Sequence, residues 1–238
     1  MSSESDKQAA AQASAALVES GMKVGLGTGS TVGYLIAYLG ERIAGGTLTG
    51  VSFVATSLGT ELLARECRLP LRRLNDAEID GALDVAIDGA DEIGPAWELV
   101  KGGGGALLGE KIVLTAAERV AIIADGTKRV SGIGERAPIP VEVVPAARLT
   151  ATARLEALGF DVALRAAERK SGPVVTDHGN LLLDIRQSDP TRPIDAAALE
   201  RDLCAIPGVV ECGIFVGVAT DLFIAEDGAV THSTQPGE

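Results

Sequence analysis

The sequence of 238 residues predicts an α/β protein, in which a Rossmann-like, mostly parallel sheet domain is joined to a smaller α+β domain of ferredoxin-like type. Short apolar runs alternate with helical patterns as far as residue 131, which is typical of parallel strands with crossover helices. A Gly/Pro-rich passage at 132–140 then interrupts the alternation. Beyond it, the order of elements fits a split β-α-β unit. The sequence therefore predicts a large domain of residues 1–131 and 208–238 and a small domain of residues 132–207.

The large domain is expected to begin with a helix. Residues 6–20 form an alanine-rich amphipathic pattern, and Gly21 is its C-terminal stop. A buried strand at 22–27 runs into TGST at 28–31, which opens a second helix ending near Ala44. The elements expected next are a strand at 51–56, a helix at 58–67, strands at 71–74 and 83–88, a helix at 105–118 and a strand at 119–125.

The small domain contains a turn sequence, DHGN at 177–180, between two apolar runs, and this predicts two strands joined by a turn. The chain beyond it, at 218–230, predicts a hairpin that rejoins the first sheet. The other elements expected here are strands at 141–144, 160–164 and 209–214 and helices at 147–158 and 195–205, with the turn joining strands at 174–176 and 181–185.

The net charge and the hydropathy of the chain argue against some kinds of binding partner. The formal net charge of −12 argues against a nucleic-acid partner and against an anionic membrane, because both require clustered lysine and arginine. No run approaches the roughly 18 apolar residues of a transmembrane helix. The N-terminal MSSESDKQ is polar and lacks the apolar core of a signal peptide. These features predict a cytoplasmic protein.

The positions of the cysteines and histidines indicate whether the chain is expected to bind a metal. Cys67, Cys204 and Cys212 have no CxxC spacing and are predicted to be free, partly buried thiols. The two histidines, His178 and His232, lie outside the glycine-rich motifs. No metal site and no histidine-based triad are therefore predicted. Acid–base chemistry would then depend on carboxylates and lysines.

The first motif, GLGTGST at 25–31, leads from a strand into a helix. Its backbone N–H groups, including that of Gly29, and the hydroxyls of Thr28, Ser30 and Thr31 can hold a phosphate at a helix N-terminus. The motif matches neither the dinucleotide fingerprint nor the P-loop. An ordinary helix cap by Ser or Thr is the alternative.

The second motif, DGAD, consists of Asp88, Gly89, Ala90 and Asp91 and follows a buried strand. Two carboxylates held close together in a cleft leave one of them able to exchange a proton. An Asx-turn or a cap is the alternative interpretation.

The third motif, KGGGGALLGEKI at 101–112, sets Lys101 beside four glycines that open an apolar helix. A cation next to several backbone N–H donors suits a developing oxyanion, although a flexible loop is the alternative. Glu110 lies about one and a half turns into this helix, where it can also be an ordinary solvated glutamate.

The fourth motif, DGTK at 125–128, ends with Lys128, which can reach a phosphate or remain a surface lysine. TGST, DGAD and DGTK each follow a predicted strand directly. Ligands of open parallel sheets bind outside the carboxyl ends of the strands. The three motifs are therefore expected to meet at one edge of the sheet, with KGGGG joining them from the loop after the aspartates.

Together these motifs resemble those of type A ribose-5-phosphate isomerases. The combination of DGADE, KGGGGA and a glutamate nine residues after the lysine is highly specific, and the similarity covers nearly the whole chain. The resemblance implies a two-domain aldose–ketose isomerase of the pentose phosphate pathway, without metal or cofactor, that is a homodimer or other homo-oligomer such as a tetramer. The matching segments are TGST (28–31), TSLGTE (56–61), DGADEI (88–93), KGGGGALLGEKI (101–112), DGTK (125–128), PIPVEV (138–143), VVTDHGN (174–180) and IPGVVECGIF (206–215).

The resemblance also implies roles for individual residues. Glu110 is the base that moves a proton between C2 of ribose 5-phosphate and C1 of ribulose 5-phosphate. Asp88 and Asp91 handle ring opening and hydroxyl protons, and Lys101 with the glycine loop stabilises the enediolate. Ser30, Thr31, Lys128 and Lys7 hold the substrate and its phosphate. The full set of substrate-binding residues implied is Lys7, Thr28, Gly29, Ser30, Thr31, Asp88, Gly89, Ala90, Asp91, Lys101, Gly102, Gly103, Gly104 and Lys128.

Two positions depart from the family pattern. Gly109 stands where a bulky, often basic residue is usual, and Thr127 stands where serine is usual. Threonine keeps the hydroxyl, so little change is expected there. A glycine inside a helix costs about 1 kcal/mol of helix stability relative to alanine. The missing side chain at 109 bears on substrate affinity more than on reaction type.

Three other functions are weaker alternatives. An amino-sugar phosphate deaminase is expected to have a histidine that assists ring opening, and His178 and His232 both lie outside the motifs. A sugar-phosphate sensor of a transcription regulator is expected to have a basic DNA-binding module, which the sequence lacks. A dinucleotide-binding protein is expected to have an acidic residue at a fixed distance after a proper glycine fingerprint.

Overall fold

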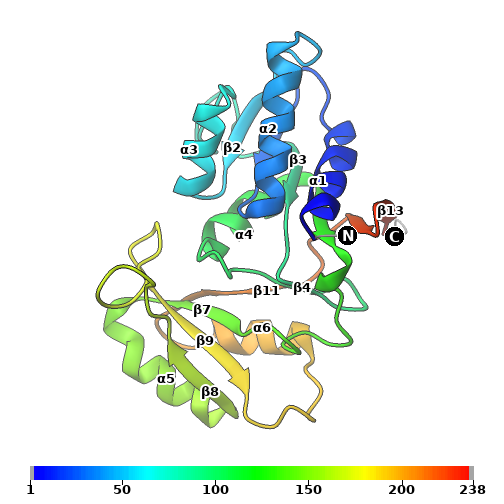
Figure 1. Cartoon of the computed structure of the whole chain (residues 1–238). Helices are drawn as coiled ribbons and strands as arrows, with labels where there is room; N and C mark the ends of the chain where they lie inside the picture. Colours follow the sequence, from blue (N-terminus) through cyan, green and yellow to red (C-terminus); the bar gives the residue numbers. More distant parts are fainter. Residues whose placement is uncertain (1–2, 236–238) are drawn as a thin grey trace. The chain divides into compact units, whose positions relative to one another are not determined.

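The computed structural model describes residues 3–235, and the chain divides into two compact units. The first unit comprises Met1–Ala90, Gly109–Lys128 and Val218–Glu238, and the second comprises Asp91–Leu108 and Arg129–Gly217. Figure 1 follows the chain through the elements of both units.

A six-stranded sheet forms the centre of the first unit, with the strand order β13-β12-β6-β3-β1-β2. All neighbouring strands pair parallel, except that the edge strand β13 pairs antiparallel with β12. The predicted parallel sheet and the predicted return of the last strands as a hairpin are confirmed. The strands are β1 (Lys23–Leu26), β2 (Ser52–Ala55), β3 (Leu83–Asp88), β6 (Ala117–Asp125), β12 (Asp221–Glu226) and β13 (Ala229–Thr234).

Helices pack on both faces of this sheet. On one face, apolar side chains of α1 (Ser3–Ser14), α2 (Ser30–Ala44) and α3 (Leu58–Glu66) share one core with the strands, and the 3-10 helix η1 (Ala15–Leu17) extends α1. On the other face, α4 (Leu107–Thr115) brings Val113 against β1. A Cβ on Gly25 would lie 2.7 Å from Val113 Cγ1, so glycine at this position lets α4 approach the strand closely.

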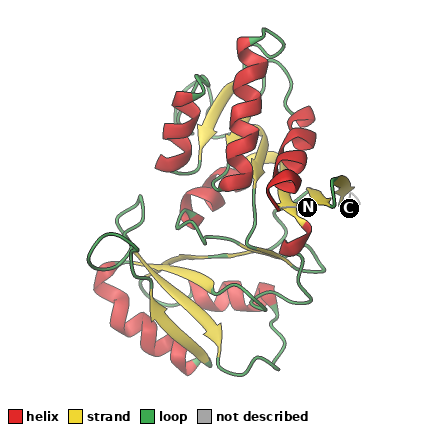
Figure 2. Ribbon diagram, in the orientation of Figure 1, coloured by secondary structure: helices red, strands yellow, loops and turns green. Residues whose placement is uncertain are grey.

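The second unit contains a four-stranded antiparallel sheet with the order β10-β7-β9-β8. Leu155 of α5 and Leu203 of α6 join one core with β7 and β9, so both helices cover the same face, and Figure 2 shows them beside the sheet. This arrangement is the predicted ferredoxin-like one. The elements are β7 (Ile139–Val143), η3 (Pro145–Ala147), α5 (Arg148–Ala157), β8 (Phe160–Leu164), β9 (Leu181–Gln187), α6 (Ala196–Cys204) and β10 (Val209–Cys212).

A small three-stranded sheet in the second unit was not expected from the sequence. It has the order β11-β5-β4 and consists of β4 (Glu92–Ile93), β5 (Leu99–Val100) and β11 (Ile214–Phe215). The strand predicted at 209–214 is in fact two strands, which Gly213 separates. A Cβ on Gly213 would lie 2.2 Å from the Lys101 carbonyl oxygen, so only glycine allows the two backbones to meet here.

Two further strand predictions are wrong. At 71–74 the structure has only an isolated bridge between Leu71 and Phe53, because Arg73 and the residues after it enter turns, with the Arg73 N–H bonded to Asp76. At 174–176 it has only an isolated bridge between Val175 and Leu181. The helix predicted at 105–118 is shorter, since the φ of +80° at Gly105 is not helical and β6 already begins at Ala117.

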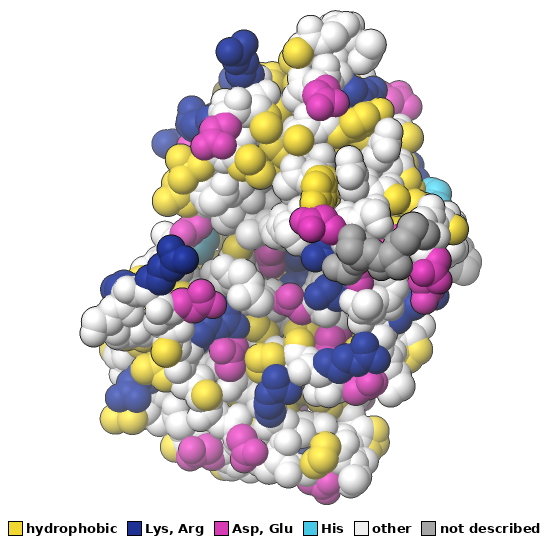
Figure 3. All heavy atoms as spheres, in the orientation of Figure 1, with side chains coloured by type: hydrophobic (Ala, Val, Ile, Leu, Met, Phe, Trp, Pro, Cys, Tyr) yellow, Lys and Arg dark blue, Asp and Glu magenta, His cyan; other side chains and the backbone are white. Residues whose placement is uncertain are grey.

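On the face drawn in Figure 3, acidic side chains are interspersed with basic ones. Among the helices of residues 3–235, none is long and apolar enough to cross a membrane. None of the three cysteines, all within these residues, takes part in a disulfide.

Candidate active site

The carboxyl ends of three adjacent parallel strands carry three of the predicted motifs. Strands β1, β3 and β6 are neighbours in the sheet, so TGST, Asp88 and DGTK follow them at the same edge. The predicted meeting is confirmed for TGST, DGTK and residues 88–90 of DGAD, whereas Asp91 belongs to the second unit. The short 3-10 helix η2 (Gly126–Lys128) follows β6 and carries Lys128.

Asp88 is completely buried and fixes the start of the TGST loop. Its Oδ1 accepts hydrogen bonds from the N–H groups of Thr28, at 3.0 Å, and Gly89, at 2.7 Å. A Cβ on Gly27 would lie 2.0 Å from this same oxygen, so residue 27 must be glycine for the contact to exist. Asp88 is predicted to exchange protons with the substrate. Its carboxylate therefore also holds in place the TGST loop, which is predicted to bind the phosphate.

A cluster of hydroxyl groups surrounds Thr28. Its Oγ1 lies 2.8 Å from Thr56 Oγ1, 2.7 Å from Ser57 Oγ and 3.1 Å from Thr60 Oγ1. Thr60 in turn donates to the carbonyl oxygen of Gly27 at 2.7 Å. The Thr28 side chain thus ties the loop after β1 to the loop after β2. This role of TSLGTE was not predicted from the sequence, although the segment follows a strand of the same sheet.

The N-terminus of α2 is suited to bind an anion. Gly29 precedes the helix with a φ of +127°, and it has no side chain with which to cap the first N–H groups. Gly29 and Ser30 are exposed, and Thr31 is half-buried. The first turn of a helix offers unpaired N–H groups and the positive end of the helix dipole. A phosphate fits this chemistry.

Two lysines of the first unit were predicted to contact the substrate. Lys128 is half-buried at the end of η2. The turn before it is fixed by Asp125, whose Oδ1 accepts hydrogen bonds from both the N–H, at 3.0 Å, and the hydroxyl of Thr127. Threonine thus supplies the hydroxyl at the position where serine was expected. Lys7 is half-buried on α1, next to Asp6, which accepts the Gly228 N–H at 2.9 Å.

Glu110 lies on α4 in the first unit, and only 4% of its surface is exposed. Glutamates are almost never this deeply buried unless they are paired or have a function. The alternative of a solvated helix glutamate is therefore wrong.

The glycine loop belongs to the second unit, where Asp91 holds it. Asp91 Oδ2 accepts the Gly103 N–H at 2.7 Å, while the Asp91 N–H bonds to the carbonyl oxygen of Val100 at 2.8 Å. Gly102 and Gly105 have φ values of +99° and +80°, and a bond of 2.9 Å from the Gly105 N–H to the Gly102 oxygen closes a turn. The loop is therefore an ordered turn, and its Gly103 and Gly104 are exposed.

Arg165 is a residue of this region that the sequence analysis missed. Its Nη1 donates to the carbonyl oxygens of Gly102, at 2.8 Å, and Gly103, at 3.2 Å. Its Nε donates to Asp184 Oδ2 at 2.8 Å, and its Nη2 pairs with the other Asp184 oxygen. The arginine directly follows β8, far from the loop in sequence, and no pattern in the sequence signals the contact.

Lys101 is 2% exposed and directly follows β5. Its backbone N–H donates to the Gly213 oxygen at 2.8 Å, and its Nζ lies 5.7 Å from the centre of the Phe215 ring. A cation over an aromatic face is stabilised by the ring quadrupole. Gly213 therefore fixes the backbone of Lys101, and Phe215 of β11 lies against its side chain.

The predicted residues divide between the two units. Lys7, Thr28, Gly29, Ser30, Thr31, Asp88, Gly89, Ala90, Glu110 and Lys128 belong to the first unit. Asp91, Lys101, Gly102, Gly103 and Gly104 belong to the second. The joining of KGGGG to the other three motifs stays a prediction.

Comparison with known proteins gives one consistent result. The model of the family described as ribose 5-phosphate isomerase A (phosphoriboisomerase A) matches residues 52–228. The protein named ribose-5-phosphate isomerase A of Thermosynechococcus vestitus is 47% identical over 220 residues, which are 92% of this chain and 91% of that protein.

Two solved structures are similar over almost the full length. One of D-ribose-5-phosphate isomerase in complex with phospho-erythronic acid has a TM-score of 0.94 at 36% identity, covering 99% of this chain and 100% of that one. One of ribose 5-phosphate isomerase A from Methanocaldococcus jannaschii has a TM-score of 0.90 at 38% identity, covering 98% and 100% of the two chains.

Proposed function

Because the chain belongs to the ribose 5-phosphate isomerase A family, we propose that it interconverts D-ribose 5-phosphate and D-ribulose 5-phosphate in the pentose phosphate pathway. The observation that carries this proposal is the burial of three charged residues. Asp88, Lys101 and Glu110 are each 4% exposed or less. Ionisable groups that a fold keeps in its interior are candidates for proton chemistry.

Glu110 acts as the general base on the open-chain sugar. It takes the proton from C2, the C–H electron pair forms the C1–C2 double bond, and the negative charge moves onto O1. The proton then returns to C1 while the O2 hydroxyl proton passes to O1, which leaves a ketone at C2. A positioned general base contributes roughly 10²–10⁴ in rate.

Lys101 and the glycine loop stabilise the enediolate that this transfer creates. A proton next to a carbonyl is removed readily only if charge on the oxygen is stabilised, and one well-placed donor is worth about 10²–10³ in rate. Support comes from the order of the loop, which is held by Asp91 and Arg165. Donors fixed before the reaction need no reorganisation when the charge develops.

The two aspartates serve the steps on either side of enolisation. Ribose 5-phosphate is mainly a ring, and opening it requires a proton on the ring oxygen and removal of a proton from the O1 hydroxyl. Asp88 and Asp91 carry these protons and those of the hydroxyl exchange. Their fixed hydrogen bonds to Thr28, Gly89 and Gly103 support this assignment, because each carboxylate is held in one orientation.

The phosphate binds at the N-terminus of α2, with the hydroxyls of Ser30 and Thr31 and the ammonium groups of Lys128 and Lys7. Binding energy from the phosphate then orients the reacting carbons against Glu110. The similar isomerase in complex with phospho-erythronic acid supports a phosphate-bearing ligand.

The test is solvent exchange during turnover. Incubation of ribose 5-phosphate with the protein in deuterated water should give ribulose 5-phosphate that carries deuterium at C1, because the Glu110 carboxylate exchanges its proton with solvent. Product without deuterium would indicate a direct hydride shift and would contradict the enediolate. Binding of ribose 5-phosphate without turnover would favour a sensor, and ammonia release from glucosamine 6-phosphate would favour a deaminase.

We further propose that the protein is a cytoplasmic homo-oligomer, as the family resemblance implies. Light scattering coupled to size-exclusion chromatography gives the mass directly. A dimer would be about twice, and a tetramer about four times, the chain mass of 24.3 kDa.

A further inference from the structure

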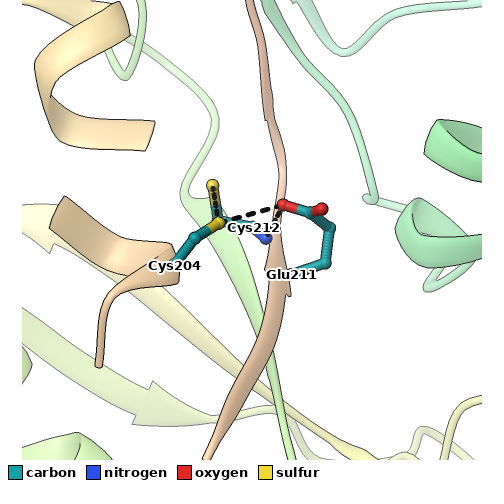
Figure 4. Close-up of side chains that lie close together, drawn as sticks. All are labelled: Cys204, Glu211 and Cys212. Atoms are coloured by element: carbon teal, nitrogen blue, oxygen red, sulfur yellow. Dashed lines mark hydrogen bonds between the residues drawn. The ribbon is translucent and has the colours of Figure 1, made fainter. Parts of the chain in front are cut away.

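Two cysteines of the second unit meet at the ends of neighbouring elements. Cys204 is the last residue of α6, and Cys212 is the last residue of β10. Their sulfur atoms lie 4.0 Å apart. Figure 4 shows the two side chains next to one another. Helix α6 packs on strand β10, so the packing of these two elements sets the distance.

Glu211 brings a carboxylate to the same place. Its Oε1 lies 3.1 Å from Cys204 Sγ and accepts the Cys212 N–H at 2.9 Å. Adjacent residues of a regular strand point to opposite faces, but the register of β10 against β7 shifts between Val209 and Glu211. A bulge re-aims the side chains beside it. All three potential ligand atoms lie within 4.8 Å of one another.

We propose that Cys204, Glu211 and Cys212 form a binding site for a thiophilic divalent cation, with Zn²⁺ as the best fit. Tetrahedral zinc with Zn–S bonds of about 2.3 Å places two thiolates about 3.8 Å apart. The observed sulfur separation is 4.0 Å, so the pair needs almost no movement. Two sulfurs and one carboxylate leave a fourth position for water.

Access and charge fit this assignment. Cys204 is exposed, Glu211 is half-buried and Cys212 is buried, so a cation can enter from solvent. The hydrogen bond with Cys212, followed by burial and the nearby Glu211, raises the pKa of the Cys204 thiol. A cation offsets this crowding of acidic groups, and on binding both thiols release their protons to solvent.

The test is a zinc titration of the full chain, kept reduced with a phosphine, against a chromophoric chelator. We expect one tight Zn²⁺ per chain and a rise in melting temperature with zinc. Cys204→Ser and Glu211→Gln should each weaken binding at least about tenfold, because each removes one of three ligands. Cobalt should bind with the thiolate charge-transfer band of a tetrahedral site.

Cys67→Ser is the matched control. Cys67 belongs to the first unit and is not one of the three clustered residues, so its loss should leave the titration unchanged. Zinc should also protect Cys204 and Cys212, but not Cys67, from thiol reagents. The proposal is overturned if wild-type protein and the Cys204→Ser variant bind zinc equally, or if the protein binds none while both thiols are shown to be reduced.

Discussion

The backbone N–H of Gly103 donates a hydrogen bond of 2.7 Å to the Asp91 carboxylate. The carboxylate lies so close that a Cβ on residue 103 would be 2.7 Å from Asp91 Oδ1. The absence of a side chain at this position is therefore what allows the acid to fasten the loop. Gly103 is thus needed because the Asp91 carboxylate comes so close to the backbone, whereas Gly102 and Gly105 are needed for their positive φ values.

Gly103→Ala should lower kcat/KM at least about 10²-fold, because the added methyl group forces Asp91 away and misplaces the N–H donors. Gly132→Ala is the matched control, since a Cβ there meets nothing within 4 Å. Steady-state kinetics and circular dichroism melts check both variants. Equal kcat/KM values for the two variants, with both folded, would contradict the importance of this contact.

Arg165→Met should loosen the glycine loop without unfolding the protein. The methionine keeps part of the apolar stem but removes the bonds to the carbonyl oxygens of Gly102 and Gly103. We expect faster amide hydrogen exchange in residues 102–105 and a fall in kcat of about tenfold, the size of one or two lost hydrogen bonds.

Arg186→Met serves as the comparison for Arg165. Arg186 also donates to a backbone carbonyl, that of Arg136 at 2.9 Å, but is exposed and does not contact the loop. Its loss should leave the exchange of the loop amides as in the wild-type protein. If Arg165→Met left that exchange unchanged too, Arg165 would not position the loop.

Glu110→Gln should reduce turnover by roughly 10²–10⁴, because the amide cannot accept the C2 proton. It should leave the thermal stabilisation by ribose 5-phosphate largely intact, since the substitution preserves shape. Glu118→Gln, an exposed glutamate at the start of β6, provides the control. Near-normal turnover by Glu110→Gln would mean that another group is the base.

Asp221, the first residue of β12, should make the stability of the fold depend on pH. Asp221 is 2% exposed and bonds to Arg119 through both carboxylate oxygens, at 2.8 and 2.7 Å, to His232 at 2.7 Å and to Thr220 at 2.8 Å. Burial raises the pKa of Asp221, but the hydrogen bonds from Arg119, His232 and Thr220 outweigh this effect and bring the pKa to about 2. The carboxylate is therefore stabilised in its charged form by folding.

A carboxyl with a depressed pKa stabilises the fold above its unfolded pKa, near 4, and this stability is lost as the pH falls through about 2. The lowered pKa of Asp221 corresponds to a contribution of about 2 kcal/mol to the free energy of unfolding. Asp221→Asn should thus lower the free energy of unfolding by about this much at pH 7, with the difference shrinking in urea melts between about pH 4 and pH 2. The exposed Asp202→Asn should show no such dependence; a constant difference for Asp221→Asn would exclude the linkage.

Isomerase turnover should be equal before and after treatment with EDTA, because the mechanism we propose uses a carboxylate base, a lysine and backbone N–H donors and no metal. The same treatment of zinc-loaded protein should lower its melting temperature by emptying the cysteine site. Turnover tests whether a metal takes part in the reaction, and the melting temperature tests whether zinc stabilises the fold. Loss of turnover with EDTA would show that a metal takes part in the reaction.

The sequence predicted the longer strands of both units well because the signals for these strands are local. The strand predicted at 83–88 is β3, and the one at 160–164 is β8, since each is an apolar run bounded by turn residues. Strands β4 and β5 were missed, because two-residue strands carry no periodicity. Strand β5 also pairs with β11, which is more than 100 residues away in sequence.

Local patterns also predicted that TGST and Asp88 lie together, whereas contacts between segments distant in sequence could not be predicted. Asp88 is the last residue of β3, Thr28 lies just after β1, and the pairing of these two strands brings them together. Arg165 reaches the glycine loop only through the pairing of β8 with β9. Cys204 and Cys212 lack CxxC spacing, so no sequence pattern predicts the cluster that α6 and β10 create.

Strand β6 lies inside the large sheet, between β3 and β12. Strand β3 is synthesised before β6, but β12 is synthesised much later. Val120 of β6 and Thr220, which bonds to it just before β12, are 100 residues apart in sequence. As the chain leaves the ribosome, one edge of β6 therefore stays open while the second unit is synthesised. An open apolar strand edge invites pairing with other chains. The length of the inserted segment thus sets how long each newly made chain is exposed to aggregation, and to capture by chaperones.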